Sequence, residues 1–203
     1  MSRALGIVFC LLMSACLTTG KRGNEAVPLT YDLGLTETKK PASPVLTATT
    51  LEVRAPLWLD TMGIDYRLLY AEPARLREYA RSRWVGPPSQ LLQQRLAART
   101  GLLLPGQAGG RCLLRLELLE FAQWFDHPQA SRVVMHGRLQ WLDRQRAILA
   151  EREVRLEQAA ETPDARGAVK GLAAVVEQLA LELPSWLVEV GATGGKGKSC
   201  QPD

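Results

Sequence analysis

Three consecutive segments in the second half of the chain alternate between apolar and polar residues, and this pattern limits the fold more than any other feature of the sequence. The segments are residues 112–121, 132–141 and 148–157. In the middle segment Met135 and Leu139 fall on one face, while His136 and Arg138 fall on the other. Alternation of this kind is typical of antiparallel strands with one buried and one solvated face. We therefore predict a three-stranded antiparallel meander.

The stretch that follows the meander has the clearest helical period in the chain. Apolar residues recur every three or four positions from Val169 to Leu183, with charged residues on the other side. Thr162 is a suitable N-cap and Pro163 suits the first helical position, while Pro184 is expected to break or kink the helix. Such a helix buries its apolar side against a sheet, which indicates a two-layer domain.

The first half of the chain predicts shorter elements. Strands are expected at residues 31–35, 45–54 and 64–70, and helices at residues 73–80 and 87–100. Gly101 is a suitable stop for the second helix. With 46% hydrophobic and 23% charged residues, the composition is that of a globular protein. The predicted fold class is therefore α/β (α+β), a single compact domain in which a mostly antiparallel sheet packs against helices in two layers.

The N-terminus carries a targeting signal. Arg3 precedes an apolar run, residues 4–13, that is too short to cross a bilayer and is typical of a secretion signal. The run leads into a Met-Ser-Ala-Cys sequence that resembles the bacterial lipobox, so Cys16 is the predicted lipidation site. An ordinary secretion signal with an incidental cysteine is the alternative. Leu17, rather than Asp, after the cysteine indicates the periplasmic face of the outer membrane.

These features divide the chain into four parts. Residues 1–15 are the predicted signal peptide, 16–28 the lipidated N-terminus and tether, 29–190 the α/β domain and 191–203 a glycine-rich tail. Signal removal and acylation of Cys16 leave two thiols, and the periplasm is oxidising. We therefore predict a disulfide between Cys112 and Cys200 that ties the tail to the sheet. The alternative is a buried Cys112 and a free Cys200.

Residues 56–96 carry a family resemblance. Three short stretches hold it: Pro56-Leu57-Trp58-Leu59-Asp60, Ile64-Asp65-Tyr66-Arg67 and Arg83-Trp84-Val85-Gly86-Pro87-Pro88. Together with Tyr31-Asp32-Leu33, the lipobox and the closing helix, they resemble the ABC-type transport auxiliary lipoproteins, the PqiC-like family. The resemblance covers nearly all of the chain that follows the signal peptide.

The resemblance implies a periplasmic accessory subunit rather than a catalyst. The implied partners are an MCE-domain protein, of the class that forms lipid-carrying tubes between two membranes, and its ABC transporter, with a ring-shaped homo-oligomer as the implied assembly. The positions that carry the family motif or contact a partner are Tyr66, Arg83, Trp84, Pro87 and Pro88. For Trp84 a place in the core is favoured over an interface, because fully exposed Trp is uncommon. An assembly or stabilising lipoprotein of another envelope complex is the alternative function.

The sequence contains no motif that indicates catalysis, metal binding or nucleic-acid binding. Neither His127 nor His136 has a Cys or second His at metal-ligand spacing, and nucleophile-elbow, Walker A and zinc-protease motifs are absent. The scattered basic residues and the net charge of +4 give no nucleic-acid signature. The carboxylates that could form a site are Asp60, Asp65, Asp126 and Asp143. We interpret them as solvated loop and strand-end residues, and expect no enzyme activity, cofactor or metal.

Overall fold

The structure, a computed structural model, describes residues 27–35 and 43–200 of the chain. Its strands are β1 (Leu29–Tyr31), β2 (Thr49–Arg54), β3 (Gly63–Leu68), β4 (Arg77–Trp84), β5 (Cys112–His127), β6 (Ala130–Leu142) and β7 (Ile148–Ala159). Its helices are α2 (Pro44–Thr47), α3 (Pro88–Thr100), α4 (Ala165–Ala192) and the 3₁₀ helix η1 (Thr193–Cys200). The predicted signal peptide and Cys16 lie outside the described residues.

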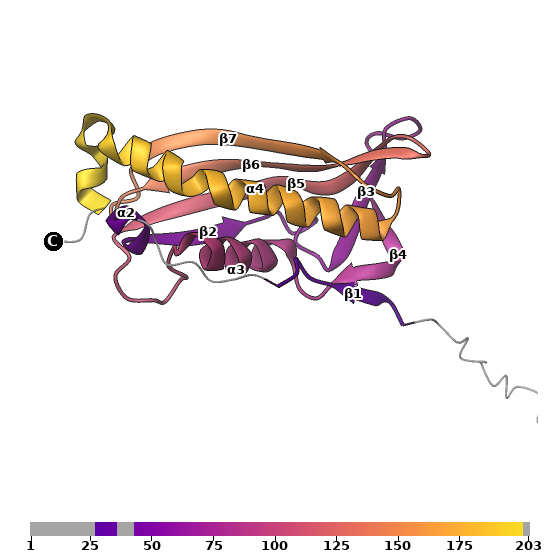
Figure 1. The fold of residues 1–203 in the computed structure, drawn as a ribbon, viewed down its shortest axis with the longest axis horizontal. Helices are drawn as coiled ribbons and strands as arrows, with labels where there is room; N and C mark the ends of the chain where they lie inside the picture. The colour runs from indigo at the N-terminus through magenta and orange to yellow at the C-terminus, as the bar shows by residue number, and fades with distance from the viewer. Residues whose placement is uncertain (1–26, 36–42, 201–203) are drawn as a thin grey trace, which may run out of the picture.

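The 16-residue strand β5 organises the sheet. Strand β6 lies antiparallel along one edge of β5, and β7 lies beyond it. Two shorter strands share the other edge, both parallel to β5: β2 lies beside residues 112–117 and β3 beside residues 122–125. Strand β4 is antiparallel to β3, and β1 is parallel to β4. The order is β1-β4-β3-β5-β6-β7, with β2 in line with β3 (Figure 1).

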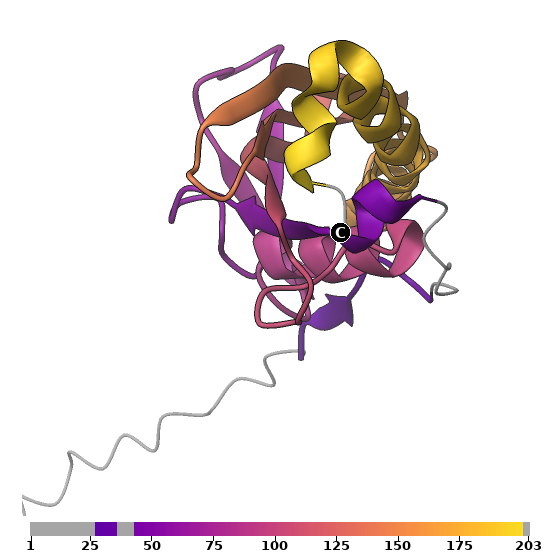
Figure 2. The same cartoon turned by 90° about the vertical axis from the view of Figure 1, so that its left-hand side faces the viewer.

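Helices α3 and α4 cover one side of the curved sheet, as the end-on view shows (Figure 2). Their buried residues, among them Leu92, Leu96 and Leu172, join the inward side chains of the strands in one hydrophobic cluster. Gly171 lets α4 approach β6 closely, because a Cβ at this position would lie 2.9 Å from side-chain carbons of Val133. The charged faces of β5, β6 and β7 point away from these helices. The sheet and the helices are thus the two layers of the domain.

The predicted fold class and the predicted meander are confirmed. The three alternating segments form β5, β6 and β7, which pair antiparallel in chain order. The sheet is mixed, with three antiparallel strand pairs and three parallel ones, and the two longest ladders are antiparallel. Helix α3 matches the second predicted helix, and Gly101 ends it in the left-handed conformation with φ 76°.

The prediction of a helix at residues 73–80 is wrong, because its first half is a turn and its second half begins strand β4. Its Ala, Arg, Leu and Glu residues favour a helix when the segment is considered alone. Pairing overrides that preference, since β4 hydrogen-bonds to β3 on one side and to β1 on the other. The strand is therefore set by tertiary contacts that no local window contains.

The predicted strands at residues 31–35 and 45–54 are partly correct. Strand β1 ends at Tyr31, because Asp32 Oδ1 accepts a hydrogen bond from the Gly34 N–H at 2.7 Å and Gly34 adopts φ 82°, which turns the chain away from the sheet. The second segment opens with the helical turn α2, in which Ser43 caps the N-terminus and Pro44 takes the first position. Only its last six residues form strand β2.

Helix α4 begins at a different cap from the one predicted. Its N-cap is Asp164, whose carboxylate accepts a hydrogen bond from the Gly167 N–H at 2.9 Å. Thr162, the predicted cap, donates its hydroxyl to Asp164 instead. These two hydrogen bonds hold the pKa of Asp164 below its usual range.

Of the two outcomes predicted at Pro184, a break or a kink, the break is wrong, since α4 continues through this residue to Ala192. Packing holds the last turns, because Leu187 is fully buried and the Trp186 ring centre lies 5.0 Å from the Arg152 guanidinium. By length and composition α4 is apolar enough to cross a bilayer. Its apolar side chains instead fill the core beneath the sheet.

Cys112 and Cys200 form a disulfide, the pair that we predicted. Cys112 begins β5, and Cys200 ends η1, which packs on α4. Both residues are buried. The bond therefore holds η1 against the start of the central strand, and the alternative of a free Cys200 is not what the structure contains.

Loss of this disulfide is expected to destabilise the protein. The bond joins residues 88 positions apart, and cross-links of this kind contribute about 2–4 kcal/mol, in the usual account by restricting the unfolded chain. Cys200→Ser should lower the free energy of unfolding by that amount in urea titrations of the oxidised protein. In the control, reductant should destabilise the parent and leave a Cys112→Ala/Cys200→Ala variant unchanged. Two alkylatable thiols in non-reduced periplasmic protein would contradict the prediction.

Candidate functional site: a groove between β1 and α4

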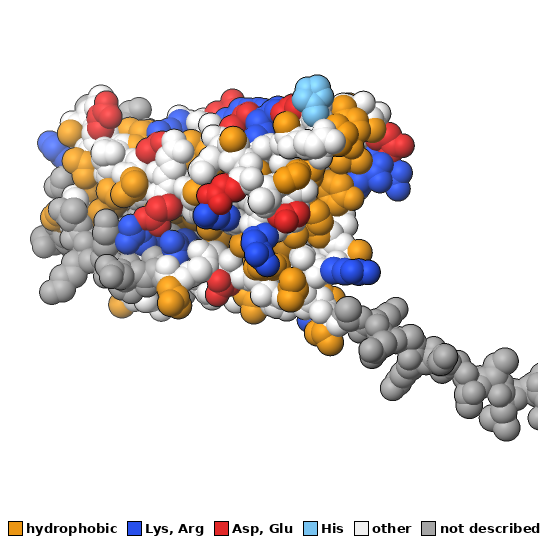
Figure 3. Space-filling view, turned by 45° about the vertical axis from the view of Figure 1, so that its right-hand side comes forward, with side chains coloured by type: hydrophobic (Ala, Val, Ile, Leu, Met, Phe, Trp, Pro, Cys, Tyr) orange, Lys and Arg blue, Asp and Glu red, His pale blue; other side chains and the backbone are white. Residues whose placement is uncertain are grey.

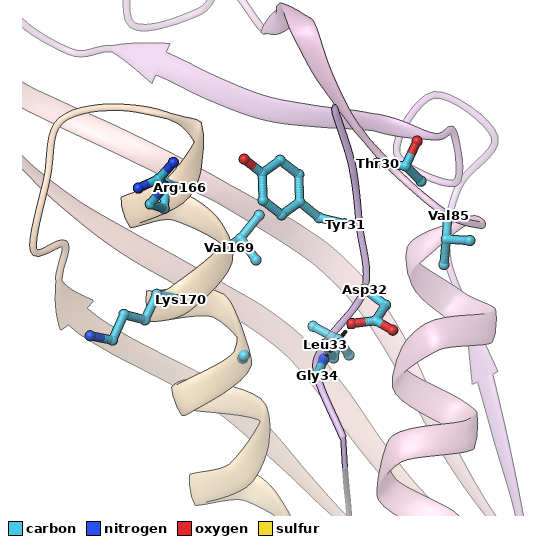
Figure 4. A pocket seen from close by; sticks show the side chains of 10 residues that line it. Thr30, Tyr31, Asp32, Leu33, Gly34, Val85, Arg166, Val169 and Lys170 are labelled. Atoms are coloured by element: carbon cyan, nitrogen blue, oxygen red, sulfur yellow. Dashed lines mark hydrogen bonds between the residues drawn. The ribbon is translucent and has the colours of Figure 1, made fainter. Parts of the chain in front are cut away.

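An open groove of about 530 Å³ lies between β1 and the first half of α4 (Figure 4). One wall is the chain from Thr30 to Gly34, and the other is α4 from Arg166 to Ala173. Val85, which follows β4, completes the lining. The volume falls in the range of ligand and cofactor sites, and the groove is therefore the candidate functional site.

The β1 wall is tied to both neighbouring helices. Arg95 of α3 donates hydrogen bonds to the carbonyl oxygens of Gly34 at 3.0 Å and Leu35 at 2.8 Å. The same guanidinium lies 3.3 Å from the Glu177 carboxylate of α4. Glu177 also pairs with Arg99 of α3. The wall is thus anchored by α3 and α4 in addition to its pairing with β4.

The groove combines an apolar lining with charged side chains of both signs, since exposed Asp32 lines the β1 wall and Arg166 and Lys170 line the α4 wall. The Tyr31 ring points from β1 toward α4, where Val169 faces it (Figure 4). On the rim, Lys170 is neutralised by Glu161, 2.6 Å away. Arg166 is exposed and forms no ion pair with any residue that the structure describes. The arrangement therefore suits an apolar segment that carries an anionic group near Arg166.

The outer edge of β1 has no strand partner within residues 27–35 and 43–200. Strand β1 pairs with β4 on one side only and is the last strand in the sheet order. A free edge presents unpaired backbone N–H and C=O groups. An extended peptide can add to such an edge as a further strand, with side-chain pockets supplying selectivity. Beside β1 the apolar groove offers such a pocket.

The structure brings two stretches of the family resemblance together at this groove. Tyr31, Asp32 and Leu33 line it. Val85, from the second stretch, also lines it, and its N–H donates a hydrogen bond to the Tyr31 carbonyl oxygen at 2.7 Å. Sequence analysis identified both stretches but gave no sign that they touch, because the contact depends on the parallel pairing of β1 with β4.

Trp84 and Pro88, two of the predicted motif positions, are buried. Trp84 is 1% exposed, and its ring centre lies 5.9 Å from that of Phe121. The structure thus places Trp84 in the core, as the favoured interpretation predicts. Pro88 opens α3 and faces the interior. Neither side chain is accessible to a partner in this structure.

The other three motif positions lie on the surface or close to it. Arg83 is exposed on β4 and stands opposite Thr30 of β1. Pro87 is the half-buried N-cap residue of α3. Tyr66 is half-buried on β3, with its ring centre 4.7 Å from that of Tyr79. Of the five positions, Arg83 is the one whose side chain is fully available to a partner.

Asp60 has a structural role that sequence analysis missed. Pro87 supplies no side-chain cap for α3. Asp60 replaces it from the connection between β2 and β3, since its carboxylate accepts hydrogen bonds from the Ser89 N–H at 3.0 Å and the Ser89 hydroxyl at 2.8 Å. The interpretation of Asp60 as a solvated loop residue is therefore wrong. Its charge stabilises a helix N-terminus.

Asp126 and Asp143 lie at strand ends, as expected. Asp126 pairs with Arg132, and Asp143 accepts a hydrogen bond from the Ala147 N–H at 2.9 Å in the turn between β6 and β7. Among the residues that the structure describes, no group of three or more His, Cys, Asp and Glu side chains is placed to hold a metal ion.

Asp65 is buried, which overturns its interpretation as a solvated carboxylate. It is 2% exposed on β3, stands opposite Glu78 of β4, and its Oδ1 has no hydrogen-bond partner in the described part of the chain. Glu120, which pairs with Arg67 at 3.1 Å, adds a second negative charge nearby. Burial, together with Glu78 and Glu120, raises the pKa of Asp65 to about 7.

Replacement of Asp65 by Asn is expected to change how stability depends on pH. The folded-state pKa of Asp65 lies above its unfolded value of about 3.9. Its ionisation therefore costs stability, beginning above pH 4, growing until about pH 7 and staying constant beyond. Asp65→Asn removes this cost. The unfolding free energy of the variant, relative to that of the parent, should therefore rise by about 2 kcal/mol when the pH is raised from 5 to 8. Parallel pH profiles in urea titrations would show that the carboxyl is ordinary.

Comparison with known proteins identifies the fold. No family model matches the chain, and no curated protein is significantly similar to it. A solved structure from Xanthomonas campestris, of the DUF330 family, superposes with a TM-score of 0.68 at 16% identity, over 82% of this chain and 99% of that chain. This chain has the DUF330 fold. An uncharacterised protein superposes with a TM-score of 0.61 at 19% identity, over 79% of this chain and 99% of that one. The DUF330 fold is the PqiC-like fold, which agrees at the level of architecture with the family resemblance.

Proposed function

We propose that the protein is a periplasmic accessory lipoprotein, anchored in the outer membrane through Cys16, that docks an MCE-domain protein of an ABC-type lipid-transport system and so supports envelope integrity. The observation that carries the proposal is the convergence of residues 31–33 and Val85, which carry the family resemblance, on one groove. The DUF330 fold of the chain supports it.

The groove is suited to docking because its walls are fixed before a partner arrives. Arg95 and Glu177 tie the β1 wall to α3 and α4, so little ordering cost remains for the protein itself. The free edge of β1 supplies backbone hydrogen bonds, and Tyr31 and Val169 supply apolar contact. An extended apolar segment of the partner, with an acidic group near Arg166, meets all of these features.

The position of β1 in the chain agrees with a role at the membrane. It is the first strand of the domain, and Leu29 follows the proposed anchor Cys16 by thirteen residues. A partner bound beside β1 therefore lies within about 45 Å of the acylated residue, since a chain spans at most roughly 3.6 Å per residue.

Loss of the acylated cysteine is expected to release the protein from the membrane. Two or more acyl chains give stable anchoring, whereas none leaves only surface contacts. Cys16→Ser should shift the protein from the membrane fraction to the soluble periplasmic fraction, with the parent as the control. Intact-mass measurement that finds the N-terminus elsewhere, and no acyl chains, would contradict the lipoprotein proposal.

Charge reversal at the groove is expected to weaken docking. Arg166 is exposed and forms no ion pair within the described chain, so Arg166→Glu should leave the fold intact and reduce capture of the MCE partner about tenfold, through like-charge repulsion with the partner's anionic group. Arg144→Glu is the matched control, because Arg144 is equally exposed in the turn between β6 and β7. Quantitative pull-down of the partner by the full-length lipoproteins measures both. Equal capture by the two variants would remove the groove from the interface.

A further inference from the structure

Exposed hydrophobic side chains lie at the end of the molecule from which the N-terminal segment leaves, with Lys and Arg side chains beside them (Figure 3). Six of them form what we call the N-terminal apolar surface: Val27, Leu29, Leu57, Trp58, Met62 and Val85. Leu57 is 92% exposed and Trp58 is 52% exposed. Single exposed apolar residues are ordinary, but a group of this size at one end of a domain indicates a contact surface.

Hydrogen bonds hold the three segments of the N-terminal apolar surface side by side. The Trp84 N–H donates to the Met62 carbonyl oxygen at 2.7 Å, which places the connection between β2 and β3 against the end of β4. The Val85 N–H donates to the Tyr31 carbonyl oxygen at 2.7 Å, which places the end of β4 against β1. The exposed side chains therefore belong to one continuous region of the fold.

The turn that carries Leu57 and Trp58 is fixed in its outward orientation. Leu59, on the same turn, is 1% exposed and packs in the core. Asp60 follows and is bound to Ser89 at the start of α3. Leu59 and Asp60 thus fix the turn to the domain. Leu57 and Trp58 can therefore be buried only by contact with another molecule.

Positive charge lies next to this surface. Arg83 is exposed on β4, stands opposite Thr30 of β1 and Gly63 of β3, and forms no ion pair with any described residue. Arg81 is also exposed on β4 without an ion pair to a described residue. Exposed aliphatic and aromatic side chains next to unpaired arginines are typical of protein surfaces that lie on an anionic lipid layer, where the rings and chains enter the interface and the guanidinium groups meet phosphates.

The length of the N-terminal segment allows such contact. Val27 follows Cys16 by eleven residues, and a chain spans at most roughly 3.6 Å per residue. We propose that the N-terminal apolar surface rests directly on an anionic lipid bilayer, as a second attachment besides the acyl chains. The acyl anchor belongs to the proposed function, whereas contact between Trp58 and lipid is a separate claim that can fail while the anchor holds.

Quenching of tryptophan fluorescence tests the claim in the full-length lipoprotein. The protein is reconstituted in vesicles of phosphatidylethanolamine and phosphatidylglycerol with brominated acyl chains, which quench only tryptophans that enter the lipid layer. We expect Trp58→Phe to remove more than half of the quenching seen in the parent. Trp186→Phe is the matched control, since Trp186 is half-buried on α4 against Arg152 and should leave the quenching unchanged.

Two further variants separate lipid contact from simple proximity. Leu57→Asp should reduce the quenching of Trp58, while Leu181→Asp, at a site 62% exposed on α4, should not. Efficient vesicle flotation without quenching of Trp58 would overturn the proposal and leave the acyl anchor as the sole attachment. Protection of Trp58 only when an MCE partner is added, or only in an oligomer of this chain, would likewise overturn it and assign the surface to protein contact.

A third experiment measures vesicle binding by protein that lacks the acyl anchor. Full-length Cys16→Ser protein leaves the membrane fraction because the surface contact alone is weak, but it should still bind vesicles that contain phosphatidylglycerol when lipid is in large excess. Leu57→Asp in this background should lower the partition coefficient about tenfold. Leu181→Asp should leave the coefficient unchanged. Failure of the unlipidated protein to bind anionic vesicles, or equal losses in both Asp variants, would contradict the proposal whatever the outcome for the anchor.

Discussion

Strand β5 pairs with three other strands, and its length is the constraint on which the rest of the structure depends. On one edge, its first half pairs with β2 and its second half pairs with β3. On the other edge it pairs with β6. The register shifts between Leu118 and Glu120, where β2 has ended and β3 has not begun. The chain between β2 and β3 therefore leaves the sheet at this point, and it is this departure that presents Leu57 and Trp58 and brings Asp60 to α3.

The elements that sequence analysis predicted correctly are those whose signals are local. The alternation in β5, β6 and β7 and the helical period of α4 each arise within a single segment, so they can be recognised without knowledge of the partners. Strand β4 has no such signal, because its strand character comes from β1 and β3. Pro184 was expected to break or kink α4, but the helix does not end there, and the burial of Leu187 holds the turns beyond it. Local rules fail at these two places because strand pairing and core packing outweigh the local conformational preference.

In the candidate site, too, some features have a local sequence signal and others depend on tertiary contacts. The residues of the family resemblance, Tyr31 and Val85 among them, were identified from their sequence context, but their meeting in a groove depends on the parallel pairing of β1. Arg166 and Arg95 carried no sequence signal at all, because an arginine on an amphipathic helix is ordinary until its neighbours are known. The buried state of Asp65 was missed for the same reason, since the opposing Glu78 comes from a segment predicted to be helical.

Several arginines on the solvated face of the sheet are paired with carboxylates on neighbouring strands, as in Arg115 with Glu52 and Arg67 with Glu120. Near β1, the exposed arginines Arg83 and Arg166 find no such partner among the described residues. Cations without an ion pair beside apolar side chains leave the region around β1 ready for contact.

Helix α4 fills the middle of the core, yet it follows all seven strands in the chain. Until residues 165–192 have been made, the inward side chains of β6 and β7 lack the helix that covers them. Contacts between distant parts of a chain form slowly. In the exported lipoprotein that we propose, the core therefore closes only after the last helix has crossed the membrane.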